Sequence, residues 1–257
     1  RTAWGCCLMM LPDPVVEEYQ GIIVVRDDQI PGGTKSRYLL PLFQNFPHVV
    51  YASPACGGAQ LSLAYCAQLT NRQATVFVAQ RKQPHARTLE AKAAGAHVFQ
   101  VSPGYLTNVQ AKARRYAAVL AAYYMEFGGE SPEAIGVIAE VAACVKDLVG
   151  KLDEVWCAAG SGVLIRGLQL GLEAKRFFAV QVGHVLTPKE VSCADILVYP
   201  LPFDRESHYP VPFPSCRNYD AKAWEYCVRF GKGRRLFWNV LGPSPTPFMG
   251  LEPRLTT

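Results

Sequence analysis

Strand-like and helix-like runs alternate along most of this chain, and this alternation is the feature that most limits how it can fold. Short apolar runs rich in β-branched residues predict strands at residues 21–25, 49–52, 74–79, 97–101, 154–158, 177–182, 196–199 and 236–240. Apolar residues at three- and four-residue spacing predict helices at residues 61–69, 87–94, 109–127, 132–149 and 164–173. The pattern therefore predicts an α/β protein with mostly parallel sheets.

Two breaks in the pattern indicate where the chain divides. Gly128-Gly129-Glu130 and residues 44–47 are candidate hinges. We therefore expect a smaller inserted αβα domain at residues 46–130, and a larger domain formed by residues 1–45 together with 131–257. A stretch with frequent proline and interleaved aromatic residues, 200–214, predicts an ordered loop of the kind that often covers a site.

Composition limits the environment and the partners of the protein. No segment approaches the roughly 18 consecutive apolar residues of a membrane-spanning helix, so we expect no membrane contact. The 9 cysteines form no Cys-x-x-Cys pair, which favours a reducing cytoplasm over a disulfide framework. The 5 histidines show no ligand spacing, which predicts that no metal is bound. Basic residues gather at Arg81-Lys82, near Arg114 and at 229–235, which predicts solvated surfaces or contact with an anionic ligand or nucleic acid.

Lys35 follows Pro31-Gly32-Gly33-Thr34 and precedes an apolar helical pattern that includes Tyr38. Proline and glycine break the chain there, so Lys35 is expected in the first turn of the helix. A cation at that end opposes the helix dipole, and this favours the neutral amine. A neutral lysine amine is the form that makes Schiff bases with carbonyl compounds. A surface lysine after a glycine turn is the alternative.

Gly160-Ser161-Gly162-Val163-Leu164 follows one predicted strand and leads into a predicted helix. Glycines let backbone N–H groups approach an anion, and the helix N-terminus adds unpaired donors, so the segment predicts a phosphate site. A dinucleotide fingerprint would need glycine where Ile165 stands, and no Gly-x-x-x-x-Gly-Lys motif occurs. A plain strand-to-helix turn is the alternative. Together with Lys35, the loop favours a phosphorylated aldehyde, and pyridoxal phosphate fits both.

With these motifs the chain resembles the fold-type-II pyridoxal-phosphate enzymes, which include the tryptophan synthase β-subunit. It is most similar to the branch of 1-aminocyclopropane-1-carboxylate deaminase and D-cysteine desulfhydrase. The matching segments occur in the family's order, namely Val25-Arg26-Asp27-Asp28, Gly32-Gly33-Thr34-Lys35-Ser36-Arg37, Gly160-Ser161-Gly162-Val163, Tyr219-Asp220-Ala221-Lys222-Ala223 and Leu236-Phe237-Trp238-Asn239-Val240. The resemblance implies the tryptophan synthase β-like fold, in which pyridoxal 5'-phosphate lies in the cleft between two αβα domains. It also implies a small amino-acid substrate, and we expect a homodimer.

The resemblance assigns roles to particular residues. Lys35 would hold the cofactor as a Schiff base and later act as general base. The cofactor's phosphate would contact Gly160, Ser161, Gly162, Val163 and Leu164. Tyr219 would contact the substrate, with a packed aromatic as the alternative. The pyridine nitrogen has three open candidates by region, which are Glu206, Ser215 and Asn239.

One departure from the family concerns its Ser-Asn-His segment. An ungapped comparison puts Gly57-Gly58-Ala59 in that place, so the serine and asparagine of the family are absent. The glycine turn can still hold a carboxylate through its N–H groups. Side-chain options for the substrate are Ser53, Cys56 and Gln60. We therefore expect a lyase-like reaction, such as decarboxylation or elimination, rather than deamination.

Three other functions stay open. The chain also resembles divergent bacteriophage pyridoxal-phosphate enzymes that tailor an amino acid already attached to thymine in DNA. This resemblance rests on residues 53–60, on residues 127–135 and on Tyr219-Asp220-Ala221-Lys222-Ala223-Trp224. The protein would then act in the host cytoplasm on a modified nucleotide or DNA. A non-catalytic cofactor-binding module and a dinucleotide-dependent reductase are the remaining alternatives.

Overall fold

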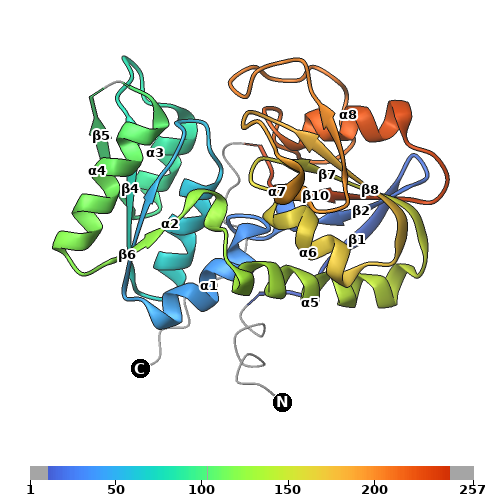
Figure 1. The fold of residues 1–257 in the computed structure, drawn as a ribbon, viewed down its shortest axis with the longest axis horizontal. Helices are drawn as coiled ribbons and strands as arrows, with labels where there is room; N and C mark the ends of the chain where they lie inside the picture. The colour runs from blue at the N-terminus through green and yellow to red at the C-terminus, as the bar shows by residue number, and fades with distance from the viewer. Residues whose placement is uncertain (1–10, 103, 244–257) are drawn as a thin grey trace.

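Two separate sheets organise the chain, as Figure 1 shows for the computed structural model, which describes residues 11–102 and 104–243. Within these ranges a larger, six-stranded sheet has the order β1-β2-β10-β7-β8-β9, and a smaller, four-stranded sheet has the order β5-β4-β3-β6. The larger sheet consists of β1 (Val16–Tyr19), β2 (Ile22–Arg26), β7 (Leu152–Ala159), β8 (Ala174–Gln181), β9 (Asp195–Val198) and β10 (Arg235–Asn239). The smaller sheet consists of β3 (His48–Ala52), β4 (Gln73–Ala79), β5 (His97–Val101) and β6 (Tyr123–Met125).

The larger sheet brings the two ends of the described chain together. Strand β10 lies parallel to both β2 and β7, with Trp238 opposite Val25 on one side and Cys157 on the other. Only β1, on the edge, runs antiparallel. The carboxyl ends of β2, β10, β7 and β8 therefore meet at one edge of the sheet, where open α/β sheets bind ligands.

Helices cover both faces of the larger sheet. In Figure 1, α5 (Pro132–Val149) and α6 (Val163–Gly171) lie on one side and α8 (Asp220–Phe230) on the other. The short α7 (Pro188–Val191) contacts α6. The Ser131 hydroxyl caps α5 by accepting a hydrogen bond from the N–H of Ala134 at 3.1 Å, which fixes where this helix begins.

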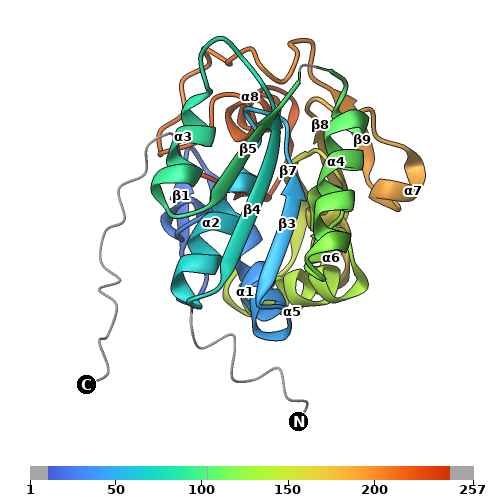
Figure 2. The same cartoon turned by 90° about the vertical axis from the view of Figure 1, so that its left-hand side faces the viewer.

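The smaller sheet is also covered on both faces, because alternate strand residues point to opposite sides. Val50 and Phe77 pack with Val109, Ala113 and Ala117 of α4 (Leu106–Val119). Figure 2 shows α4 on one face, and α2 (Ala59–Leu69) with α3 (Ala86–Ala93) on the other. Helix α1 (Lys35–Asn45) contacts both α2 and α5, so it joins the two halves.

The structure corrects the helix predicted at residues 109–127. Helix α4 begins at Leu106 and ends at Val119, and β6 follows at Tyr123–Met125. The sequence predicts a longer helix because no glycine or proline marks the turn after α4. In the structure Ala121, in that turn, has a φ of 51°.

No helix in the described ranges is both long and apolar enough to span a bilayer.

Candidate active site

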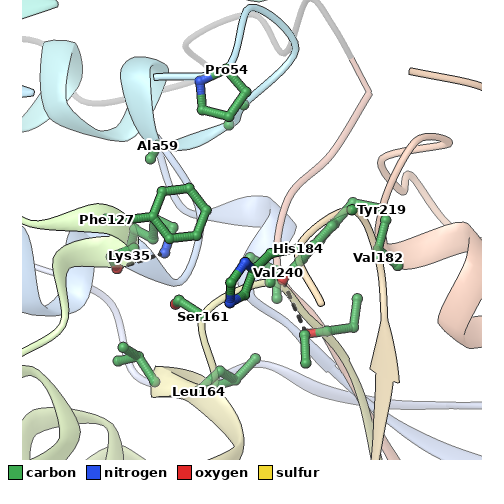
Figure 3. Close-up of a pocket in the computed structure, with 18 of the residues that line it drawn as sticks. Lys35, Pro54, Ala59, Phe127, Ser161, Leu164, Val182, His184, Tyr219 and Val240 are labelled. Carbon is green, nitrogen blue, oxygen red and sulfur yellow. Dashed lines mark hydrogen bonds between the residues drawn. The ribbon is translucent and has the colours of Figure 1, made fainter. Parts of the chain in front are cut away.

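A cavity of about 860 Å³ lies between the two sheets. Its walls come from the starts of α1, α2, α4 and α6, from the ends of β7 and β10, and from the 3-10 helix η4 (Phe127–Gly129). Figure 3 shows Lys35, Phe127, Ser161 and His184 facing this space from different segments. The cavity thus gathers chain ends that are far apart in the sequence.

Lys35 is the first residue of α1 and lines the cavity, as its sequence pattern predicts. Its amine donates hydrogen bonds to the Tyr38 hydroxyl at 2.8 Å and to the Gly128 carbonyl at 3.1 Å. Burial lowers the pKa of Lys35 to about 8, because a charged amine loses solvation inside the protein. A substantial fraction of this amine is therefore neutral near physiological pH.

Gly33 allows Lys35 to reach this position. It has a φ of 72°, and an added Cβ would overlap the carbonyl oxygen of Val240. The N–H of Thr34 donates to that same oxygen at 3.0 Å. The N–H of Val240 in turn donates to the Asp220 carboxylate at 3.1 Å. The first turn of α1 is therefore held directly against the end of β10.

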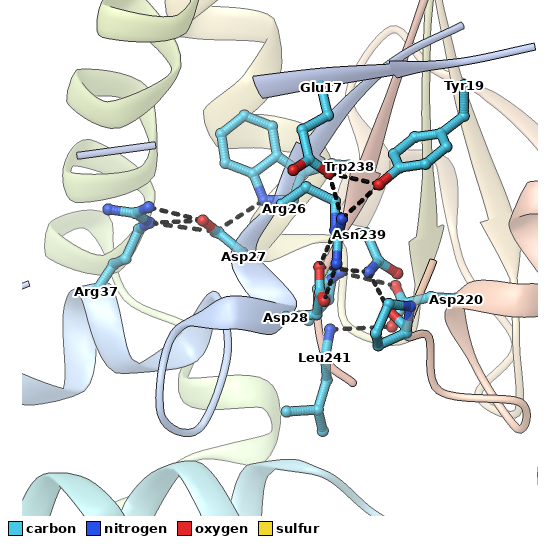
Figure 4. A network of polar contacts seen from close by, with 12 residues as sticks. Glu17, Tyr19, Arg26, Asp27, Asp28, Arg37, Asp220, Trp238, Asn239 and Leu241 are labelled. Atoms are coloured by element: carbon cyan, nitrogen blue, oxygen red, sulfur yellow. Dashed lines mark hydrogen bonds and ion pairs between the residues drawn. The ribbon is translucent and has the colours of Figure 1, made fainter. Parts of the chain in front are cut away.

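A buried polar network lies behind this contact (Figure 4). Asp27 accepts hydrogen bonds from Arg37 at 2.7 Å and from the indole of Trp238 at 3.0 Å. The same indole donates to the Thr34 hydroxyl at 3.1 Å. Asp28 binds Arg26 through both carboxylate oxygens, each at 2.8 Å. These contacts tie α1 to β2 and β10 and orient the segment that carries Lys35.

The N-terminus of α6 faces the cavity opposite Lys35. Gly160, Ser161 and Gly162 precede the helix, and Gly162 has a φ of 74°. An added Cβ on Gly162 would overlap the carbonyl oxygen of Glu190, so only glycine fits there. The first N–H groups of a helix have no partner inside the helix, and the dipole there favours an anion. The arrangement suits a phosphate.

A second helix N-terminus faces the same cavity. Gly57, Gly58 and Ala59 lead into α2 and line the wall. The buried side chain of Gln60 donates to the Ala55 carbonyl at 2.8 Å, while its Oε1 atom has no partner within the described chain. The cavity therefore presents two helix N-termini and one amine.

The structure brings most of the predicted site residues together. Those that line the cavity are Lys35, Cys56, Gly57, Gly58, Ala59, Gly160, Ser161, Gly162, Val163, Leu164 and Tyr219. The Tyr219 hydroxyl donates to the carbonyl of Ala158 at 3.2 Å, next to the phosphate-loop candidate. The segment predicted to bind phosphate, 160–164, and the segment predicted to bind a carboxylate, 57–59, thus lie on opposite sides of the cavity that Lys35 lines.

Other predicted site residues lie outside that lining in the described structure. Asn239 donates to Asp28 at 2.7 Å and to the Pro214 carbonyl at 2.8 Å, so its amide serves the buried network. The Ser215 hydroxyl is buried, and no hydrogen-bond partner lies near it in the described ranges. Gln60 is buried behind the start of α2, and Ser53 lines a smaller adjoining cavity.

Several lining residues were missed by sequence reasoning, including Tyr38, Tyr51, Phe127, His184 and Cys216. Tyr38 stands one helical turn after Lys35, a spacing that puts both side chains on one face. Its hydroxyl also donates to the Gly128 carbonyl at 2.8 Å. Helical spacing would have found Tyr38, whereas the other residues come from segments whose proximity depends on the tertiary fold.

The lowered pKa of Lys35 predicts how its reactivity depends on pH. Trace reductive methylation with formaldehyde, mapped by peptide mass spectrometry, should rise with pH at Lys35 and be half-maximal near pH 8. The exposed Lys151 provides the internal control for access of the reagent. A labelling profile at Lys35 without a half-maximal point near pH 8 would contradict the prediction.

Comparison with known proteins places the fold. No protein-family model matches the chain, and no curated protein matches it. The crystal structure of an ACC deaminase homologue superposes with a TM-score of 0.76 at 16% identity, over 90% of this chain and 89% of that chain. Maize serine racemase gives a TM-score of 0.69 at 13% identity, over 92% and 90% of the two chains. Processed threonine deaminase isoform 2 from Solanum lycopersicum gives 0.68 at 13% identity, over 90% and 80%.

These likenesses concern the fold. They confirm the predicted α/β class and the predicted tryptophan synthase β-like fold.

Proposed function

We propose that this protein is a pyridoxal-phosphate-dependent enzyme that acts on an amino acid or an amino-acid-like substrate. The observation that carries the proposal is one cavity that holds the Lys35 amine, with a pKa of about 8, together with the N-termini of α2 and α6. A lysine amine suits an aldehyde, and the two helix ends suit two anions. Solved structures of the same fold include a serine racemase and threonine deaminases, which supports an amino-acid substrate.

The residues present fit this cofactor. Gly160, Ser161 and Gly162 line the cavity, and Gly162 packs against the Glu190 carbonyl so closely that no side chain fits there. Ser161, Gly162 and Val163 would hold the phosphate through backbone N–H groups, and Lys35 would hold the cofactor covalently. Bound pyridoxal phosphate supplies an electron sink for the bond that breaks in the substrate.

The chain's own groups favour a lyase-type reaction. The N–H groups at Gly58 and Ala59 would hold the substrate carboxylate, and the freed Lys35 amine would carry a proton to or from the reacting carbon. The Tyr38 hydroxyl, 2.8 Å from the amine, would keep that amine oriented. No hydroxyl stands at positions 57–59, where the family's serine would act, so we propose decarboxylation or elimination rather than deamination.

Titration of cofactor-free protein with pyridoxal phosphate tests the cofactor. The native protein should gain absorbance at roughly 410–430 nm that disappears on borohydride treatment. Lys35→Ala should gain no such band, and the control Lys151→Ala, at an exposed lysine, should behave as the native protein. A Lys35→Ala protein that lost the band but kept every function measured for the native protein would favour the non-catalytic module.

Turnover assays test the reaction class. Because the serine is absent, D-cysteine and 1-aminocyclopropane-1-carboxylate should be processed poorly, whereas another amino acid should release carbon dioxide or a β-substituent. Efficient turnover of either compound would mean that the protein has deaminase or desulfhydrase activity, and it would overturn the proposed reaction class.

A second candidate function is action on an amino acid already attached to thymine in DNA, as in bacteriophage hypermodified-base synthesis. Arg81, which lines an adjoining cavity and is followed in the chain by Lys82, favours it. Arg235, in contrast, donates to the carbonyls of Cys227 and Gly231, so part of that basic cluster serves the fold. Duplex DNA binding at low salt that weakens steeply as salt rises would support this candidate, and its absence would remove it.

We also propose that the protein forms homodimers. Leu148 on α5 and Leu170 on α6 are 67% and 72% exposed, and these two helices pack against each other. Sedimentation of the native protein at twice the chain's mass would support a dimer. Sedimentation as a monomer at micromolar concentration would contradict it. The cytoplasmic location stays a prediction.

A further inference from the structure

A second cavity, of about 280 Å³, adjoins the main one. The two share the lining residues Pro54, Cys56, Leu106 and Phe203, so they lie side by side. The second cavity lies beyond Pro54 and Cys56, the residues that lead into the Gly57-Gly58 turn. The second cavity, which we call the extension, therefore adjoins the place where a substrate whose carboxylate sits at that turn would carry its side chain.

Apolar, polar and charged residues line the extension. Ala55, Ala79, Leu106, Val109 and Phe203 provide the apolar surface. Arg81 and Asp204, both exposed residues, bring one positive and one negative charge to the same cavity. Neither forms a salt bridge within the described chain.

Both charges act on the same neighbouring thiol. Burial raises the pKa of Cys56, the positive charge of Arg81 lowers it, and the negative charge of Asp204 raises it. Arg81, Asp204 and Cys56 all line the extension, so both charges belong to the cavity that this thiol borders. The two charged groups form no salt bridge with each other in the described ranges, so each can contact a bound group.

We propose that the extension binds the distal end of the substrate, and that this end carries a planar CO–NH group such as an amide or a ureido group. The Arg81 guanidinium would donate to the carbonyl oxygen, and the Asp204 carboxylate would accept from the N–H. Phe203 would contact the planar face. An anionic end would gain from Arg81 but be repelled by Asp204, and a cationic end would meet the reverse, whereas a neutral group with one donor and one acceptor can bind both side chains without repulsion.

This inference rests on the proposed function, because the carboxylate turn and the cofactor orient the substrate. Its test uses the cofactor-loaded protein and measures the dissociation constants of alanine, norleucine, asparagine, glutamine, citrulline and glutamate from the change in visible absorbance. Asparagine, glutamine and citrulline offer a CO–NH group at three lengths. The best of these should bind about tenfold more tightly than both norleucine and glutamate, a difference of about 1.4 kcal/mol.

Three substitutions separate the contributions of Arg81, of Asp204 and of the space in the extension to ligand affinity. Arg81→Met should weaken the binding of the best amide ligand about tenfold. Asp204→Asn should raise the affinity for glutamate, because the substitution removes the repulsion between the Asp204 carboxylate and the side-chain carboxylate of glutamate. Ala79→Leu should fill the extension and lower the ratio of amide-ligand affinity to alanine affinity, since Ala79 lines the extension and not the main cavity. Lys82→Met is the matched control next to Arg81 and should leave every affinity unchanged.

The outcomes distinguish the two proposals. Failure of the native protein to bind pyridoxal phosphate would overturn the proposed function itself. Normal cofactor and alanine binding with glutamate at least as tight as every amide ligand would overturn only the role of the extension. If Ala79→Leu changed the affinities for alanine and for the amide ligands equally, that result would also overturn only the role of the extension.

Discussion

Gly162→Ala should weaken pyridoxal-phosphate binding by about 100-fold or more. The new Cβ would overlap the Glu190 carbonyl oxygen, and alanine would have to adopt a φ of 74°. Such backbone strain costs about 1–3 kcal/mol, and relief of the overlap would move the N–H groups that form the phosphate cradle. Each 1.4 kcal/mol of lost binding energy is about a tenfold loss of affinity. Equilibrium titration of the cofactor-free variant measures the effect.

Gly150→Ala is the matched control for this substitution. Gly150 has a φ of 67°, but nothing lies within 4 Å of an added Cβ. It ends α5 and does not line the cavity. This variant should lose some stability and keep the native affinity for pyridoxal phosphate. Equal affinities of the Gly162→Ala protein and the native protein would remove α6 as the phosphate site.

Asp27→Ala should lower the free energy of unfolding by about 3–5 kcal/mol. Asp27 is fully buried and is the charge partner of Arg37, whose side chain is also buried. Removing the carboxylate would leave the guanidinium without its counter-charge and the Trp238 indole with one fewer acceptor. Urea unfolding followed by tryptophan fluorescence measures the change.

An exposed ion pair provides the comparison for Asp27. Arg176 and Asp195 lie 2.8 Å apart with side chains 58% and 51% exposed, so Asp195→Ala should cost only about 0–1 kcal/mol. If both substitutions had similarly small effects, the buried network would not be what holds α1 against the larger sheet.

Much of the fold was predictable because strand and helix patterns alternate clearly, and the exceptions have local causes. The turn after α4 depends on Ala121 in a conformation that usually favours glycine, so the sequence carries no signal for it. The missed β1 pairs with β2 through Gln20 and Gly21, which have φ values of 54° and 71°. Two positive φ values are typical of a tight hairpin turn, but only the glycine marks it in the sequence.

The site was predictable where a local motif carries the chemistry. Lys35 and the segment from Gly160 to Leu164 line one cavity, as the pairing of an aldehyde-reactive amine with a phosphate loop requires. Asn239 and Ser215 were candidates only by region, and the fold uses the Asn239 amide to bind Asp28 instead. Sequence position alone does not say which polar group at a strand end faces the cavity and which faces the protein interior.

The most direct test of the central claim is to locate the cofactor on the chain. Protein loaded with pyridoxal phosphate, reduced with borohydride and digested, should show the cofactor's added mass on the peptide that contains Lys35. Lys222 is the informative competitor, because it is also buried and burial lowers its pKa, but it donates to the Pro202 carbonyl at 2.8 Å and does not line the cavity. Modification of Lys35 alone is the expected result, and modification of Lys222 or of no lysine would contradict the proposed function.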